Sequence, residues 1–255
     1  ATAEGGMSPR LIRKLKTYIS EGMNILDSSP GTACPVVETI KDADLCVLVT
    51  DPTPFGMHDL KLAVAMTRSL KKEPVIIVNR ASYNKLDLEE YCQAQQLEIV
   101  GEIPNDRKVA HFYSRGDLII DELPEYKILF KKIAARIIES AKHERQIKKP
   151  AEETYFFQDR QVIKKSLESD EMHGKRPKEV VIISGKGGTG KTSLTASFSA
   201  LDHSMVIADC DVDAADLHLI LKPKIKESGY FSGGVNAKII QEKCTACGKC
   251  KDACR

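Results

Sequence analysis

The sequence predicts an α/β protein with a mostly parallel sheet flanked by helices. Short, continuous apolar runs are typical of strands buried on both faces of such a sheet. Segments with helical apolar spacing lie between several of these runs. Polar or glycine-rich residues follow several runs directly. Because parallel α/β sheets bind ligands beyond the carboxyl ends of their strands, these following residues are the candidate functional residues.

The first half of the chain alternates helical and strand patterns. Three segments have apolar residues at helical spacing, namely residues 9–20, 55–70 and 126–141. Apolar runs that predict strands occupy residues 23–26, 45–50, 75–78 and 98–100. The basic helix at 126–141 could lie on a membrane surface, but its ordinary amphipathic pattern favours packing against the sheet.

Polar side chains follow two of these strands. Asp27 comes directly after the first strand and precedes a serine pair, a proline and a glycine. A carboxylate there can serve a ligand site at the sheet edge, although a lone aspartate after a strand is usually a turn former or a helix cap. Asn79 and Arg80 follow the third strand. An asparagine amide has the donor and the acceptor needed to contact a base edge, but the dipeptide alone is weak support for that role.

Residues 185–192, GKGGTGKT, match the phosphate-binding pattern G-x-x-x-x-G-K-[ST], between an apolar strand at 180–183 and a helix through 193–199. Glycines let successive backbone N–H groups face a polyphosphate, and the helix N-terminus adds partial positive charge. Lys191 would reach the β- and γ-phosphates, and the Thr192 hydroxyl would bind Mg²⁺. A glycine-rich turn without a ligand is the alternative, but the full pattern favours a nucleotide site. The predicted nucleotide contacts here are Gly185, Gly187, Gly188, Thr189, Gly190, Lys191, Thr192 and Ser193.

Four aspartates follow the apolar strand at 205–208, at positions 209, 211, 213 and 216. Carboxylates are too costly to bury unpaired, so this cluster suits Mg²⁺, an attacking water or a moving loop. The alternative is that they cap a helix at 214–221, which fits Asp213 well and Asp211 poorly.

Four cysteines near the end have the spacing C-x₂-C-x₂-C-x₃-C, at Cys244, Cys247, Cys250 and Cys254. This spacing is typical of a [4Fe–4S] site of the bacterial ferredoxin type. A disulfide framework and a zinc site are less consistent with it, because zinc sites normally use two separated pairs. In two-cluster ferredoxins the fourth cysteine ligates the other cluster, so Cys254 would serve a second cluster. The four other cysteines are single and scattered, which favours reduced, partly buried residues of a cytoplasmic protein.

Lys186, inside the glycine motif, narrows the class of nucleotide-binding protein that the sequence resembles. The stretch KGGTGKT, the D-S-S-P-G stretch at residues 27–31 and the Asn79-Arg80 pair resemble the MinD/ParA superfamily of deviant-Walker P-loop ATPases. With the cysteine motif, the chain resembles the members that carry an inserted ferredoxin domain. The resemblance implies that Lys186 reaches a dimer partner's nucleotide, that Asp211 acts on the attacking water and that Asp27 binds Mg²⁺ through water. It also implies that Asn79 contacts the adenine and that Pro104 lies at the nucleotide end.

The order of these segments differs from the family pattern. Residues 1–141 resemble the later half of the ATPase domain, 142–178 form a charged linker, 179–238 resemble the earlier half, and 239–255 begin the ferredoxin-type insert. Either the sequence is a window across two tandem copies, or it is a circular permutant whose halves build one sheet.

The charge balance and hydropathy limit the function classes. A formal net charge of +2 gives no nucleic-acid footprint. No apolar run approaches the roughly 20 residues of a membrane span, and a cytoplasmic location is expected. The resemblance favours an ATP-hydrolysing iron–sulfur protein that couples nucleotide state to redox chemistry or cluster transfer. The alternative is a non-hydrolysing iron–sulfur carrier or scaffold. The expected partners are ATP, a second copy or tandem copy of the chain, and a redox or cluster-acceptor protein.

Overall fold

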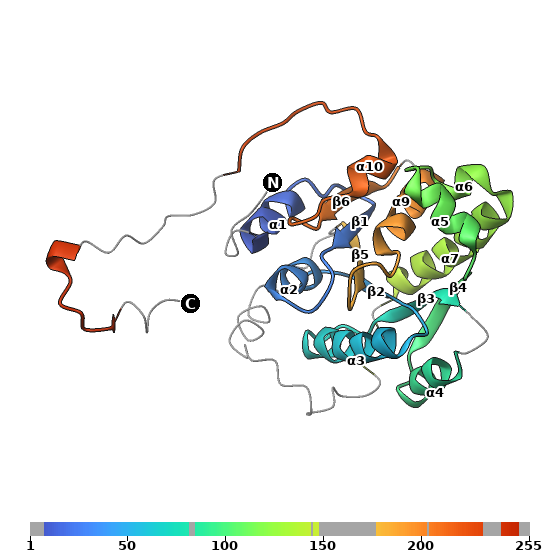
Figure 1. The fold of residues 1–255 in the computed structure, drawn as a ribbon, viewed down its shortest axis with the longest axis horizontal. Coiled ribbons are helices and arrows are strands. Elements are labelled where there is room, and N and C mark those ends of the chain that lie inside the picture. The colour runs from blue at the N-terminus through green and yellow to red at the C-terminus, as the bar shows by residue number, and fades with distance from the viewer. Residues whose placement is uncertain are drawn as a thin grey trace.

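A computed structural model describes residues 8–81, 85–143, 145–147, 177–202, 204–231 and 241–249 of the chain. Within these residues, six strands form one parallel sheet in the order β4-β3-β2-β5-β1-β6 (Figure 1). The strands are β1 (Met23–Ser28), β2 (Leu45–Thr50), β3 (Val75–Ala81), β4 (Glu98–Pro104), β5 (Lys178–Ser184) and β6 (Val206–Cys210). The predicted α/β class with a parallel sheet is confirmed.

Strands from the two halves of the chain interleave in this sheet. β5 pairs with β1 on one side, through Ile25 and Val180, and with β2 on the other, through Leu45 and Val180. The segment that resembles the later half of the ATPase domain and the segment that resembles the earlier half therefore share one sheet within this chain. The proposed domain bounds, and the choice between tandem copies and permutation, stay predictions.

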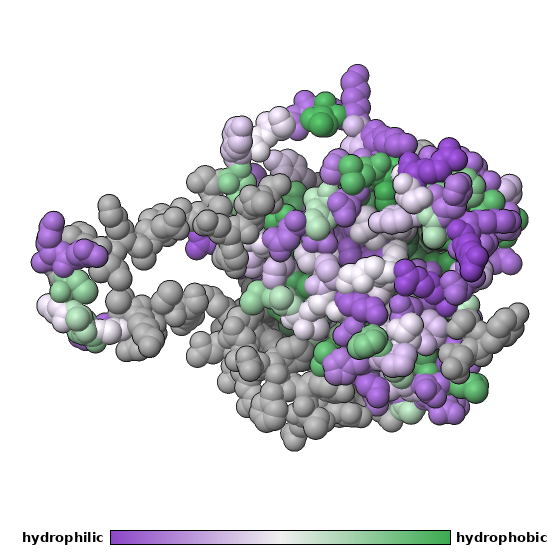
Figure 2. Space-filling view, viewed as in Figure 1, coloured by the Kyte–Doolittle hydropathy of each residue, from purple (hydrophilic) through white to green (hydrophobic). Residues whose placement is uncertain are grey.

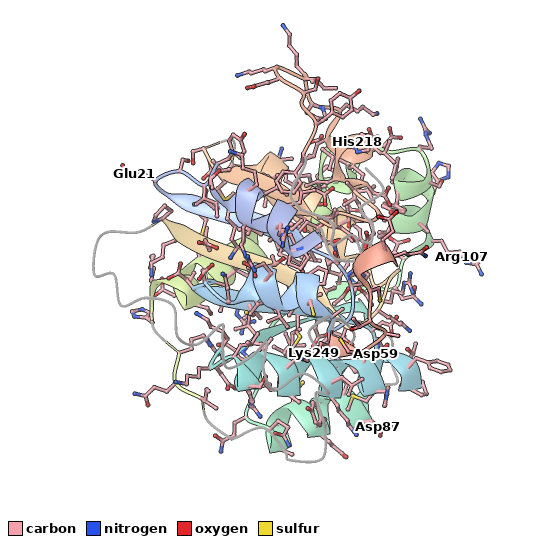
Figure 3. The ribbon with its side chains drawn as sticks, turned by 90° about the vertical axis from the view of Figure 1, so that its left-hand side faces the viewer. Glu21, Asp59, Asp87, Arg107, His218 and Lys249 are labelled. Carbon is pink, nitrogen blue, oxygen red and sulfur yellow. The ribbon has the colours of Figure 1, made fainter. Side chains whose placement is uncertain are left out.

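Helices cover both faces of the sheet. One face carries α1 (Ser8–Lys16), α2 (Cys34–Ile40), α3 (Pro54–Ser69) and α4 (Leu86–Ala94). The other face carries α7 (Pro124–Lys142) and α9 (Lys191–Leu201), with α5 (Arg107–Ser114), α6 (Ile119–Glu122) and α10 (Leu217–Leu221) beside them. Figure 3 shows α1, α2 and α3 in front of the strands. Glu21, just before β1, and Arg107, just after β4, lie at opposite sides of that view, so the loops that leave the strands gather at one edge.

Alternating side chains of each strand build a separate core on each face. In β5, Val181 and Ile183 join the core under α1 to α4, whereas Val180 and Ile182 join the core under α7 and α9. All four are at most 2% exposed. This two-sided burial is why the predicted strands are continuous apolar runs rather than alternating ones.

The element bounds differ from the prediction mainly at polar residues. β1 continues through Asp27 and Ser28, and β3 continues through Asn79 and Arg80 to Ala81. Pairing with neighbouring parallel strands continues past the last apolar residue of each strand. A prediction from apolar runs therefore ends these strands too early. The helix expected at 214–221 begins only at Leu217.

α7 packs against the sheet, as predicted for the basic helix at 126–141. Its inner side chains are buried, namely Tyr126, Phe130, Ile133, Ile137 and Ala141. The described surface over α5, α6 and α7 is mostly hydrophilic (Figure 2). Among the described residues, no helix is both long and apolar enough to cross a bilayer. Most of the predicted linker, residues 148–176, lies outside the described residues.

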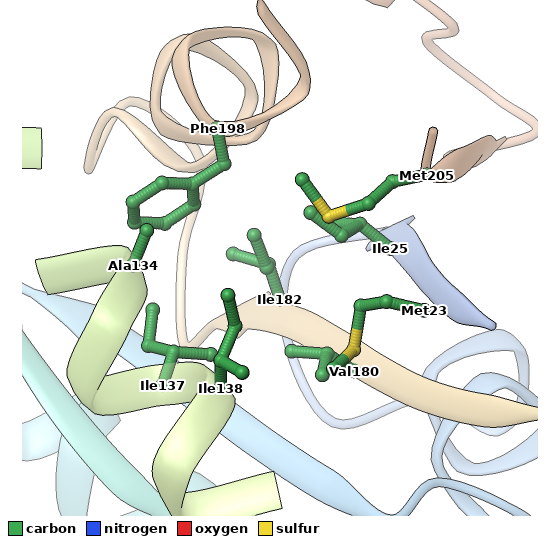
Figure 4. Close-up of a pocket in the computed structure, with 9 residues that line it drawn as sticks. All are labelled: Met23, Ile25, Ala134, Ile137, Ile138, Val180, Ile182, Phe198 and Met205. Atoms are coloured by element: carbon green, nitrogen blue, oxygen red, sulfur yellow. The ribbon is translucent and has the colours of Figure 1, made fainter. Parts of the chain in front are cut away.

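A small apolar cavity lies between the sheet, α7 and α9 (Figure 4). Its volume is about 20 Å³, and its lining includes Met23 and Val180 near the amino ends of their strands. Phe198 of α9 also borders it. Because all its lining side chains are apolar, the cavity offers no partners to water and is a packing gap.

Candidate functional site

The carboxyl ends of the strands surround one larger cavity of about 420 Å³. Nine of the predicted site residues line it, namely Asn79, Pro104, Gly187, Gly188, Gly190, Lys191, Thr192, Ser193 and Asp211. They come from the ends of β3 and β4, the loop before α9, the first turn of α9 and the loop after β6. The position fits the rule that open α/β sheets bind ligands beyond the carboxyl ends of their strands.

The loop between β5 and α9, residues 185–190, is termed the glycine loop below. It joins a central strand to the N-terminus of an eleven-residue helix, as the sequence predicts. Gly190 has a φ of +90°, and a Cβ atom there would lie 2.3 Å from Asn79 Nδ2. Only glycine therefore fits this position without a shift of the backbone or of Asn79. A Cβ atom at Gly185 would lie 2.4 Å from the Asp59 Cβ atom, because α3 packs closely on the loop.

Lys191, the first residue of α9, forms a buried ion pair with Asp27. Lys191 Nζ lies 2.7 Å from Asp27 Oδ1, and the two side chains are 6% and 1% exposed. The Thr195 hydroxyl donates to the same Asp27 oxygen at 3.1 Å. The second oxygen, Asp27 Oδ2, is buried and has no hydrogen-bond partner among the described residues. A buried carboxylate oxygen without a partner is a natural position for a cation or its water ligand.

The Thr192 hydroxyl lies next to this pair, 3.4 Å from Lys191 Nζ, and Thr192 borders the cavity. Oxygen ligands from a hydroxyl and a carboxylate are those that Mg²⁺ prefers. The residues present therefore fit a magnesium ion between the glycine loop and the end of β1.

Asn79 and Arg80 contact the glycine loop. Asn79 Nδ2 donates to the Thr189 carbonyl oxygen at 2.7 Å. Arg80 Nη2 donates to the Gly188 carbonyl oxygen at 2.8 Å, and the Arg80 backbone N–H donates to Asn79 Oδ1. Both residues also border the cavity, so either could contact a bound molecule.

Lys186 lies outside the described lining of the cavity. Its Nζ is 5.6 Å from the centre of the Phe55 ring, which is 76% exposed on α3. The Lys186 carbonyl accepts a hydrogen bond from the Ser184 hydroxyl at 2.8 Å, which fixes the backbone but not the ammonium group. In this conformation Lys186 points to the molecular surface rather than to the cavity.

Asp211 borders the cavity, and Asp209 supports the loop that carries it. Asp209 Oδ1 accepts the Asp211 backbone N–H, and Asp209 Oδ2 accepts the Leu217 backbone N–H, each at 3.1 Å. Burial, together with the neighbouring charge of Asp27, raises the pKa of Asp209 to about 6. Burial also raises the pKa of Asp211, while Lys191 opposes that shift. The alternative in which Asp213 caps a helix at 214–221 is not supported, since Asp213 is exposed and Asp209 bonds the first turn of α10.

The cysteine motif is described only in part. Cys244 and Cys247 are exposed, near the single-turn helix η1 (Gln241–Lys243), while Cys250 and Cys254 lie outside the described residues. A hydrogen bond from the Lys249 backbone and one from the Thr245 hydroxyl lower the pKa of the Cys247 thiol, which favours the thiolate that metals bind. Within the described residues, no three potential ligands come together at one metal position. Three of the other cysteines, Cys46, Cys92 and Cys210, are buried, and burial raises the pKa of each to about 12.

Several residues of the site were not singled out from the sequence. Asp51, at the end of β2, is 1% exposed and pairs with Arg80 at 3.6 Å. Asp106 and Tyr113, around α5, form a wall of the cavity. Asp51 is connected to a motif that the sequence does show, because its partner Arg80 belongs to the Asn79-Arg80 pair. Nothing in the sequence of a short helix such as α5 indicates which cavity it borders.

Comparison with known proteins finds partial matches. Two uncharacterized proteins of Methanocaldococcus jannaschii are 33% identical over 95 residues and 38% identical over 82 residues, which is 37% and 30% of this chain and 32% and 29% of those proteins. The iron-sulfur cluster carrier protein of Aquifex aeolicus is 24% identical over 136 residues, which is 46% of this chain and 37% of that protein. The chain thus spans about a third of the length of the curated relatives it matches. No family model and no solved structure matches.

Proposed function

We propose that this chain binds ATP with Mg²⁺ in the cavity at the sheet edge and hydrolyses it, coupling the nucleotide state to iron–sulfur chemistry. The observation that carries the proposal is the buried Lys191–Asp27 pair at the start of a helix that follows a glycine loop. A lysine, a free carboxylate oxygen and a helix N-terminus converge there, which are the parts that a polyphosphate with its metal requires.

Each residue has a separate role in this proposal. Lys191 binds the β- and γ-phosphates, and the glycine-loop N–H groups and Ser193 bind the remaining phosphate oxygens. Thr192 and Asp27 hold Mg²⁺, which neutralises phosphate charge when bound. Asp211 orients or deprotonates the attacking water, which its position at the cavity supports. Asn79 and Pro104 hold the adenine in this proposal, which their position at the border of the cavity supports.

The iron–sulfur part of the proposal has two supports. The cysteine spacing fits a [4Fe–4S] cluster, and a distant relative is named an iron-sulfur cluster carrier protein. Cys244, Cys247 and Cys250 would hold three irons of this cluster. The partner implied by a carrier is a protein that accepts the cluster or its electron.

A second candidate is a carrier that binds ATP without hydrolysing it. The position of Lys186 favours this candidate for an isolated chain, because its ammonium lies on Phe55 and outside the cavity. Phosphoryl transfer uses extra positive charge beside the developing phosphate charge. A second copy of the chain would then have to supply this lysine, as the resemblance to MinD-type ATPases implies.

The test compares three variants of the full chain by titration calorimetry with ATP and Mg²⁺ and by phosphate release. Lys191→Ala should weaken ATP binding by about a hundredfold or more, because charge-assisted bonds to phosphate are lost. Lys186→Ala and Asp211→Asn should bind ATP as the wild type does but release phosphate at least about a hundredfold more slowly. Lys132→Ala, exposed on α7, is the control. An equal loss of affinity in Lys186→Ala and Lys191→Ala would contradict the separate roles, and binding without turnover by the wild type would favour the second candidate.

A further inference from the structure

Two successive side chains near the end of β3 bond two successive carbonyl groups of the glycine loop. Arg80 Nη2 donates to the Gly188 oxygen at 2.8 Å, and Asn79 Nδ2 donates to the Thr189 oxygen at 2.7 Å. Both contacts join residues that are more than 100 positions apart in the sequence. They therefore depend on the sheet, which brings the end of β3 near the glycine loop.

These contacts fix the direction of the next backbone N–H groups. A peptide unit is planar and trans, so its carbonyl oxygen and the N–H of the following residue point in opposite directions. Bonding the Gly188 and Thr189 oxygens toward β3 therefore turns the Thr189 and Gly190 N–H groups away from β3. Backbone N–H groups of this loop are the donors that a phosphate would use.

Arg80 is itself held from two sides. Its backbone has a φ of +51°, a left-handed conformation that is uncommon outside glycine and often marks a functional constraint. Its Nη1 lies 3.6 Å from Asp51 Oδ2, and the Thr53 hydroxyl donates to Asp51 Oδ1 at 2.5 Å. Asp51 is buried directly after β2, so Arg80 connects the end of β2 to the glycine loop after β5.

A purely stabilising role explains this arrangement poorly. The Arg80 side chain is 55% exposed, and exposed ion pairs contribute little to the stability of a fold. The same contacts directly orient the glycine loop, because one guanidinium group can bond Asp51 and the Gly188 oxygen at once.

We infer that Arg80 is a positioning residue that orients the glycine loop for the polyphosphate of a nucleotide, independently of the base. The inference rests on the proposed nucleotide-binding function and goes beyond the base contact that the resemblance implies for Asn79. Asp51 contributes indirectly, because its carboxylate holds the Arg80 guanidinium in place.

The test measures the affinity of the full chain, with Mg²⁺, for ATP, for inosine triphosphate and for inorganic tripolyphosphate. Arg80→Ala should weaken binding of all three by about tenfold, because a charge-assisted contact that orients the loop is lost. The ratio of the ATP and inosine triphosphate affinities should stay unchanged. Arg80→Lys should recover part of the loss, since an ammonium group keeps the charge but lacks the planar fork whose two nitrogens bond Asp51 and the Gly188 oxygen. Asp51→Asn should produce a smaller loss in the same direction.

The control is Arg136→Ala, because Arg136 is half exposed and pairs with Glu98 at the amino end of β4, far along the strand from Pro104. It should leave all three affinities unchanged. Unchanged tripolyphosphate affinity in Arg80→Ala, or an altered ratio between the two nucleotides, would overturn the positioning role. A wild type that binds neither ATP nor tripolyphosphate would overturn the proposed function itself, so the two failures are distinguishable.

Discussion

A buried lysine needs a counter-charge, and Lys191 finds it in Asp27, with a separation of 2.7 Å between charged atoms. Removing one partner of such a pair would leave an uncompensated charge in a site that is at most 6% exposed. Under the proposed function, phosphate oxygens take over from Asp27 as the partner of Lys191. The Asp27 carboxylate then becomes available to Mg²⁺. The pair therefore keeps both charges compensated when no nucleotide is present.

Asp209 gives the site a predicted pH dependence. Burial and the Asp27 charge raise its folded-state pKa to about 6, above the ordinary value of 3.8. A raised carboxyl pKa means that the folded state holds a proton that the unfolded state has lost, so this contribution to stability is fully present below pH 4 and lost as the pH rises through 6. Asp209→Asn removes the titrating group. The difference in melting temperature between about pH 5 and about pH 7.5 should therefore be smaller in Asp209→Asn than in the wild type.

The measurement is thermal unfolding of the full chain in chelator and without nucleotide, so that no cation screens the carboxylates. Asp213→Asn is the matched control, since Asp213 is an exposed aspartate of the same loop. A pH difference in Asp209→Asn that equals the wild-type difference would mean that another group causes it.

At the scale of the elements, the central strands and the glycine loop were predictable from local sequence. The apolar runs of β2 and β5 are buried on both faces, so their pattern has one simple interpretation. The polar ends of β1 and β3 were not predictable in the same way. Asp27 is paired with Asp209 of β6, and β3 reaches Ala81 only through an irregular pairing with Pro104 of β4. The site follows this division. Lys191 was predictable from a motif, whereas the hydrogen bonds between Arg80 and the glycine loop depend on long-range packing.

α9 carries Lys191 at its start and anchors itself by Phe198. The Phe198 side chain is 3% exposed, and its ring lies edge-on to Phe130 of α7, with 5.6 Å between the ring centres. Because Phe198 also borders the small apolar cavity, truncating it would enlarge an existing gap. Phe198→Ala should lower the free energy of unfolding by about 3–5 kcal/mol.

Urea unfolding followed by circular dichroism measures this loss. Phe55→Ala is the control, because Phe55 is 76% exposed and its removal should change stability by less than about 0.5 kcal/mol. A loss below about 1 kcal/mol in Phe198→Ala would show that α7 and α9 close the gap by moving together.

At the scale of the whole molecule, the strand order was the least predictable feature. β5 enters the sheet between β2 and β1, which precede it by more than a hundred residues of sequence, and no local pattern specifies such pairing. Part of the chain between the cavity and the cysteine motif is described, and residues 232–240 lie outside the described residues. The chain runs from Asp211 at the cavity through α10 to the exposed residues 222–230, and Cys244 follows later in the sequence. Under the proposed function, a change at Asp211 with nucleotide state would act on the segment of the sequence that precedes the cysteine motif.

The cysteine motif leads to a prediction about the whole chain as a cluster protein. Its spacing gives three cysteines to one cubane, and in two-cluster ferredoxins the fourth cysteine ligates the neighbouring cluster. The 255-residue chain contains one such motif. When these 255 residues are tested by themselves, Cys244, Cys247 and Cys250 should hold a cluster with one iron open to solvent. Such a cluster should be labile, and anaerobic reconstitution should yield fewer than four irons per chain.

Iron analysis and electron paramagnetic resonance after reconstitution measure this outcome in the wild type and in two single-cysteine variants. Cys247→Ser should lose most of the iron, because it removes a ligand whose surroundings favour the thiolate. Cys254→Ser should lose much less, since its thiolate is predicted to serve a different cluster. Cys34→Ser, an exposed cysteine outside the motif, should match the wild type. A stable four-iron cluster that depends equally on Cys247 and Cys254 would show that all four thiolates bind one cubane, and the two-cluster interpretation of the motif would then be wrong.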